Sequence, residues 1–139
     1  MASSVIHIVV ANEINKKLQK DASKLLIGTI APDISKEVNE TKKNSHFLDD
    51  HNIPNLDKFL LKYQKNLSDD FVLGYYIHLY VDYLWFKYFL TEVYDERILK
   101  KLDGSIVKCD EKTLFTYIYN DYTNLNIQLI KKMNMRIKY

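Results

Sequence analysis

The sequence predicts a single all-α domain, a bundle of about five helices over residues 1–139. Its 3 glycines and 2 prolines supply few of the turn residues that a β-sandwich or barrel needs at its corners. Apolar residues recur at helical spacing in several segments. No repeat, linker or low-complexity tract divides the chain, and a chain of this length can bury a core of its own.

The first third of the chain contains two predicted helices and a corner. Apolar residues in 6–18 fall on one helical face, so this segment is the first amphipathic helix. A short helix over 23–27 should end at Gly28, because glycine tolerates the left-handed conformation that closes helices. Residues 31–33, Ala-Pro-Asp, are expected to form an irregular corner, and the polar residues 35–45 a surface connection.

Two further helices are predicted in the middle of the chain. Pro54-Asn55 marks the start of a helix over 56–63. Ser68-Asp69-Asp70 offers N-cap side chains for residues 71–90, a mostly apolar stretch that should be the central helix. This stretch approaches the length of a transmembrane helix, but the polar and charged side chains inside it favour a buried helix of a soluble protein.

The last third of the chain begins with a charged segment and a turn at Asp103-Gly104-Ser105. Asp110 can cap a last helix that runs from residue 111 into the region of Lys131. The side of this helix that we expect to be apolar consists of Leu114, Tyr117, Ile118, Asp121, Leu125, Leu129 and Met133.

Charge and cysteine content exclude several classes of function. With 20 Lys plus Arg and 18 Asp plus Glu, the formal net charge is +2, so no large field of one sign favours nucleic acid or an acidic partner. The last helix ends in basic residues, which the helix dipole alone explains, so nucleic acid is a disfavoured partner. These basic residues are Lys131, Lys132, Arg136 and Lys138.

The same composition bounds the compartment. Cys109 is the single cysteine, so no internal disulfide can form. The first residues lack the order of basic, apolar and small residues that a signal peptide has, so we expect a cytoplasmic protein with no membrane span. Nothing in the sequence indicates an oligomeric state.

A group of histidines and aspartates carries the chemistry. His78 and Asp82 are four residues apart in the most apolar segment, so both lie on one helical face, where a charged carboxylate needs a cation or a donor. The pair could be a buried hydrogen bond that ties helices together. It could equally belong to a metal site, to which His7, Asp33 and His46 would add imidazole and carboxylate ligands. Taken singly, His7 could be a packed core histidine and Asp33 a helix cap.

Four segments with these residues occur in a recognisable order. They are Ser4-Val5-Ile6-His7 with Ala11-Asn12-Glu13-Ile14, Gly28-Thr29-Ile30-Ala31-Pro32-Asp33, Ser45-His46-Phe47-Leu48-Asp49, and Leu73-Gly74-Tyr75-Tyr76-Ile77-His78-Leu79-Tyr80-Val81-Asp82. In this order, residues 4–90 resemble the bacterial zinc-dependent phospholipases C, whose fold is related to that of the P1 nucleases. The rest of the chain matches no family that we can name.

The resemblance implies a phospholipase C-like fold and a metal-dependent hydrolase. Its substrate would be a small phosphodiester or phosphomonoester, attacked by a metal-activated water. Asp33, His46, His78 and Asp82 would surround one ion, and His7 with a bridging Asp82 would hold a second. Zinc is the expected metal, and iron or manganese would tolerate the same ligands. The implied catalytic residues are Asp82, the shared carboxylate, and Asp33, which could accept a proton from water.

The chain also departs from this family. The phospholipases use an amino-terminal tryptophan as a ligand, where this chain has Met1-Ala2, and later histidines and a glutamate, whereas no histidine follows His78. A third metal is therefore not expected, and Asp121 is a candidate for partial compensation. The alternative function is a non-catalytic metal-binding or structural protein that keeps the fold with an incomplete ligand set.

Overall fold

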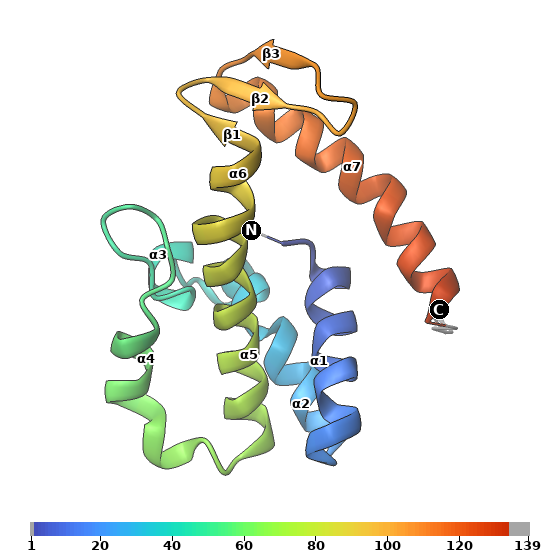
Figure 1. Ribbon diagram of the computed structural model, residues 1–139. Coiled ribbons are helices and arrows are strands. Elements are labelled where there is room, and N and C mark those ends of the chain that lie inside the picture. Colours follow the sequence, from blue (N-terminus) through green and yellow to red (C-terminus); the bar gives the residue numbers. More distant parts are fainter. Residues whose placement is uncertain (1, 134–139) are drawn as a thin grey trace.

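The computed structural model of the protein describes residues 2–133, with residues 35 and 36 described by their backbone alone. The described chain is mainly helical, and a small three-stranded antiparallel sheet lies beside the start of the last helix (Figure 1). The prediction of a helical protein is confirmed at this level. The sheet is an addition that the sequence pattern did not predict.

The first two helices pack against the central one. Helix α1 spans Ser4–Leu18, as predicted, and α2 spans Ala22–Ile30. The predicted end of α2 at Gly28 is wrong, because the helix continues without a break into the 3-10 helix η1, Ala31–Val38, which takes the place of the irregular corner. This continuation turns Asp33 toward the start of α1, where Ser4 donates a hydrogen bond to its carboxylate.

Glycine at position 28 permits a close helix crossing instead of a helix end. Helix α5, Asp70–Leu84, lies against α2, and a Cβ atom on Gly28 would stand 2.0 Å from the Phe71 carbonyl oxygen. A Cβ atom on Gly74 would likewise stand 2.0 Å from the Leu25 carbonyl oxygen. Both glycines are therefore required for α2 and α5 to approach this closely.

The middle of the chain follows the predicted capping pattern. A short helix, α3 (Lys42–Ser45), lies within the predicted surface connection, and α4 spans Leu56–Tyr63 with Asn55 as its N-cap. The 3-10 turn η2, Gln64–Asn66, leads to α5, which Asp69 caps through two backbone N–H groups. These two N-caps confirm the predicted helix starts.

The long apolar stretch is not one uniform helix. After α5 the backbone becomes a π-helix, η3 (Trp85–Leu90), followed by the single turn α6, Thr91–Val93. Within the described residues, no helix is both long and apolar enough to cross a bilayer.

The sheet consists of β1 (Tyr94–Asp95), β2 (Ile98–Lys100) and β3 (Ile106–Lys108), paired in that order. The predicted turn before β3 is present, with Gly104 at a φ of +82°. Leu99, Cys109 and Leu114 form a small core under the sheet, and Cys109 is a free thiol.

The last helix, α7, spans Glu111–Lys132 and begins at the predicted cap Asp110. Figure 1 shows it running from the sheet down along α1. Its predicted apolar side is partly wrong: Tyr122 is buried, whereas Asp121 is exposed. The helix packs obliquely against its neighbours, so the buried positions do not follow the most apolar stripe of the sequence.

Candidate metal centre

The five predicted ligand residues come together where α1, η1, α3 and α5 meet. The four most deeply buried are at most 1% exposed, and the Asp33 side chain is 22% exposed. The five residues are His7, Asp33, His46, His78 and Asp82. Their positions depend on the α2–α5 crossing, which brings η1 beside the middle of α5.

Four of these side chains direct one atom each toward a common point. The Nε2 atom of His46 lies 3.2 Å from His78 Nε2, 3.5 Å from Asp33 Oδ1 and 3.9 Å from Asp82 Oδ2. The Nε2 atom of His78 lies 3.8 Å from Asp33 Oδ1 and 3.6 Å from Asp82 Oδ2. A tetrahedral zinc ion with ligands at about 2.0–2.2 Å has edges of about 3.3–3.6 Å, so these distances are close to those of one such site.

Neighbouring backbone and hydroxyl groups fix the tautomers of both histidines. His78 Nδ1 lies 2.7 Å from the Thr29 carbonyl oxygen, which can only accept, so this nitrogen donates a proton. His46 Nδ1 lies 2.9 Å from Ser45 Oγ, and that hydroxyl already donates to the Lys42 carbonyl, so it accepts from His46. Both neutral rings therefore present an Nε2 lone pair to the same point.

Two lone pairs at this separation need something between them. A hydrogen bond between the two Nε2 atoms would require an additional proton on one ring. Burial is the main cause that lowers the pKa of His78 to about 4, and His7 adds to it, while Asp82 and Asp33 oppose it. His78 is therefore neutral at pH 7, and a cation at the common point would satisfy both nitrogens.

Asp33 supplies a negative charge at the edge of this group. Burial alone would raise the pKa of its carboxyl, but the contact with His46, the charge of His78 and a hydrogen bond from Ser4 outweigh that cost. The net pKa lies well below its usual range, so Asp33 is ionised at neutral pH. The Ser4 hydroxyl occupies Oδ2 at 2.7 Å and leaves Oδ1 facing the two histidines.

Asp82 supplies a second, fully buried carboxylate. Burial raises its pKa, but the contact with His7 and the nearby charges lower it further, so the net pKa is below the usual value. Its Oδ1 atom accepts a hydrogen bond from the Ala2 N–H group at 2.9 Å, while Oδ2 is buried without a hydrogen-bond partner. A buried carboxylate oxygen without a donor is costly, and the donor set around it fits a metal ion.

His7 lies beside this group and forms a second, smaller one with Asp82 and His78. Its ring stacks on His78 with centroids 3.7 Å apart, and its Nε2 atom lies 3.2 Å from Asp82 Oδ1 at an angle unsuitable for a hydrogen bond. Its Nδ1 atom is also buried without a hydrogen-bond partner. His78 directs its Nε2 atom into the first group, so within the described residues a second ion would have two protein ligands, His7 and Asp82.

Solvent reaches the centre at Asp33. A cavity of about 550 Å³ lies between the start of α1 and the middle of α7, and its walls carry mainly hydroxyl and amide groups. They include Ser4, Asp33, Tyr119, Tyr122, Thr123 and Asn126. Asp33 is the single charged side chain among the described residues that line this cavity, so any substrate approaches through a neutral to negative entrance.

Other candidate residues lie away from the centre. Asp121 is exposed on α7, so the structure does not support the predicted compensation for a missing ligand. Lys131 and Lys132 are exposed at the end of α7, and Arg136 and Lys138 lie outside the described residues.

Sequence reasoning missed the groups that orient the histidines. Ser45 directly precedes His46, so a local signal for its role exists in the chain. The Thr29 carbonyl group acts on His78 from 49 residues away, and no sequence pattern shows that contact.

Comparison of the chain with protein-family models, curated proteins and solved structures gave no match. The resemblance to zinc-dependent phospholipases C therefore stays a prediction. What the centre can do follows from its own geometry.

Proposed function

We propose that the protein is a metal-dependent hydrolase of small phosphoesters that binds one zinc ion. The ligands would be Asp33, His46, His78 and Asp82. The supporting observation is the convergence of two imidazole lone pairs and two carboxylate oxygens on one buried point, with separations of 3.2–3.9 Å. Nitrogen and oxygen ligands of this kind suit zinc, and they also tolerate iron and manganese.

The chain's own groups divide the work around the ion. A zinc ion bound here supplies Lewis acidity, which lowers the pKa of a water molecule and offsets charge on phosphoryl oxygens. His46 and His78 bind as neutral ligands held by Ser45 and the Thr29 carbonyl group. The low pKa of Asp33 favours a ligand role over the role of proton acceptor, because a carboxylate so strongly stabilised in its charged form is a weak base.

The entrance favours one class of phosphoester. Asp33 is the single charged side chain among the described residues that line it, so no lysine or arginine there offsets a second phosphate charge. Helix α1 begins in the same wall and has no acidic residue in its first turn, which leaves a weakly positive helix end. A phosphodiester, with one negative charge, therefore fits this cavity better than a phosphomonoester dianion.

Hydrolysis assays test this proposal directly. The purified protein is analysed for bound metal and assayed with bis-p-nitrophenyl phosphate and p-nitrophenyl phosphate. We expect zinc-dependent cleavage, faster with the diester, that a chelator and the substitution Asp82→Asn abolish. Asp121→Asn is the matched control, because it makes the same chemical change at an exposed position and should leave the rate unchanged. Hydrolysis that survives both the chelator and Asp82→Asn would contradict the proposal.

The second candidate function is a metal-binding protein without turnover. It is favoured by the scarcity of protein ligands around His7, since a two-metal mechanism needs two complete sites. Zinc bound at a ratio near one per chain, with no cleavage of either ester, would support this candidate over the hydrolase.

A further inference from the structure

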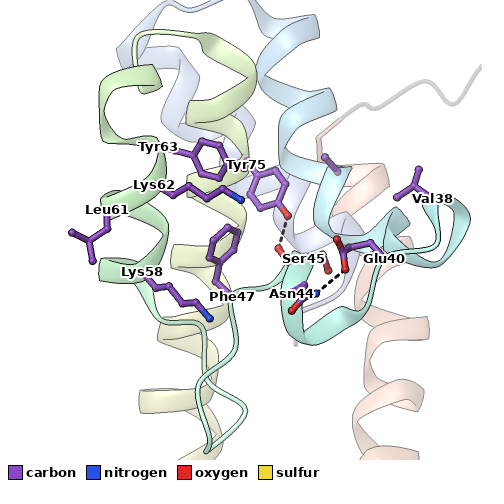
Figure 2. Close-up of a pocket in the computed structure, with 11 residues that line it drawn as sticks. Val38, Glu40, Asn44, Ser45, Phe47, Lys58, Leu61, Lys62, Tyr63 and Tyr75 are labelled. Carbon is purple, nitrogen blue, oxygen red and sulfur yellow. Dashed lines mark hydrogen bonds between the residues drawn. The ribbon is translucent and has the colours of Figure 1, made fainter.

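The largest cavity of the described chain lies between α4 on one side and η1 and α3 on the other. It has a volume of about 680 Å³, and none of the five candidate metal ligands lines it. Figure 2 shows its two walls, with Lys58, Lys62 and Tyr63 on α4 facing Glu40 and Ser45 across the opening. A pocket of this size, part aromatic and part charged, has the usual dimensions of a small-molecule site.

Its inner wall is aromatic. Phe47, Tyr63 and Tyr75 line it, and Phe47 makes edge contacts with the other two rings at centroid distances of 6.2 and 6.4 Å. The same three rings line an adjoining apolar cavity of about 160 Å³, which Phe59 and Phe71 close from the other side. A dry apolar cavity of about 150 Å³ suffices to hold a benzene ring in another protein. The pocket therefore adjoins enough apolar space for one aromatic ring.

Its mouth is cationic. Lys58 and Lys62 are one helical turn apart on α4, and Figure 2 shows both side chains extending into the space between the walls. Lys62 Nζ lies 5.1 Å from the centroid of the Tyr63 ring. Within the described part of the chain, neither ammonium group lies within ion-pair distance of a carboxylate.

One acidic side chain faces the two lysines and does not neutralise them. Glu40 Oε1 accepts hydrogen bonds from the Thr41 N–H group at 2.7 Å and from the Asn44 side-chain amide at 3.0 Å. These two bonds are the first causes that lower the pKa of Glu40, ahead of the charge of Lys62. The pocket thus carries two ammonium groups against one carboxylate that has other partners, which favours an anionic ligand.

We propose that this pocket binds a small aromatic acid. One planar ring would lie against Phe47, Tyr63 and Tyr75, and a carboxylate or phosphate group on it would lie between Lys58 and Lys62. This site is independent of the proposed metal centre, because it shares none of the candidate ligands and needs no ion.

Binding is measured on the chelator-treated full chain, so that a metal ion cannot contribute. The probes are benzoate and phenyl phosphate, which distinguish the two acid groups, together with benzyl alcohol, which lacks the charge, and butyrate, which lacks the ring. Chemical shifts of backbone amides report the position and the affinity. We expect at least one of the two acids to bind at millimolar concentration, with shifts at α4 and at residues 44–47, and both control probes to bind at least about tenfold more weakly.

Charge-removing variants locate the site. The double substitution K58Q and K62Q should weaken binding of the acid by about tenfold or more, because both ammonium groups are lost. K17Q with K24Q is the matched control, since both lysines are exposed on α1 and α2 and should leave the affinity unchanged. The proposal is overturned if neither acid binds at about 10 mM, or if K58Q with K62Q binds as tightly as the parent protein. Equal binding of butyrate would also overturn it, because the ring would then contribute nothing.

Discussion

The Nε2 atoms of His46 and His78 face each other at 3.2 Å in the protein interior. Each ring is held in this orientation by a partner on its other nitrogen, Ser45 Oγ for His46 and the Thr29 carbonyl oxygen for His78. The pair is therefore set up by groups outside the ligand set. Metal affinity should depend on those groups as well as on the ligands themselves.

Substitution of Ser45 tests this dependence. Ser45→Ala removes the acceptor for His46 Nδ1–H, so the ring loses both its preferred tautomer and part of its orientation. We expect zinc affinity to fall by about 10–100-fold. Competition with a chromophoric chelator measures the affinity, and ¹⁵N chemical shifts of the imidazole report the tautomer. Ser23→Ala, at an exposed position on α2, is the control. Unchanged affinity in Ser45→Ala would show that the hydroxyl does not position His46.

The two carboxylates should differ in how far each tolerates change. Asp82→Asn keeps an acceptor for the Ala2 N–H group but removes the charge from a fully buried ligand, so zinc affinity should fall more than about 100-fold. Asp33 is partly exposed, and water can replace it as a ligand, so Asp33→Asn should cost less. Isothermal titration with zinc measures both. A larger loss in Asp33→Asn than in Asp82→Asn would contradict this ranking.

Local signals explain which parts of the fold the sequence predicts. The helix starts at Asn55, Asp69 and Asp110 were predictable because an N-cap side chain contacts amides only two or three residues away. The end of α2 was not, because the role of Gly28 depends on Phe71, which lies far along the chain. The three-stranded sheet was missed because its strands are two or three residues long, too short for an alternating pattern.

The candidate centre divides in the same way. His78 and Asp82 share a helical face, which their spacing predicts, and Ser45 adjoins His46 in the chain. The distances among side chains from four separate elements depend on the α2–α5 crossing. Residue spacing within one segment contains no information about that crossing.

Substitution of Gly74 tests the crossing itself. Gly74→Ala would bring a Cβ atom within 2.0 Å of the Leu25 carbonyl oxygen, a backbone atom that cannot rotate away. We expect a loss of about 3 kcal/mol or more in the free energy of unfolding, measured by urea denaturation. Gly104→Ala is the comparison, because its Cβ would meet nothing within 4 Å and only the φ of +82° is strained, at a cost of about 1–2 kcal/mol. If Gly74→Ala were the milder of the two, the helices would have room to separate.

The metal-free protein should lose stability as the pH falls from about 6.5 to about 4. Burial lowers the pKa of His78 to about 4, against an ordinary value of 6.5. Within this window the unfolded chain binds a proton at His78 and the folded chain does not, so acid favours unfolding by up to about 1.4 kcal/mol per pH unit. The pKa values of Asp33 and Asp82 are also lowered, so loss of their charge adds to the effect only at still lower pH. Urea denaturation at a series of pH values measures the slope, which His78→Gln should reduce and His51→Gln, at an exposed loop position, should not. Stability that stays constant or rises as the pH falls through this window would show that His78 is protonated in the folded protein, and the two lone pairs would then not require a metal ion.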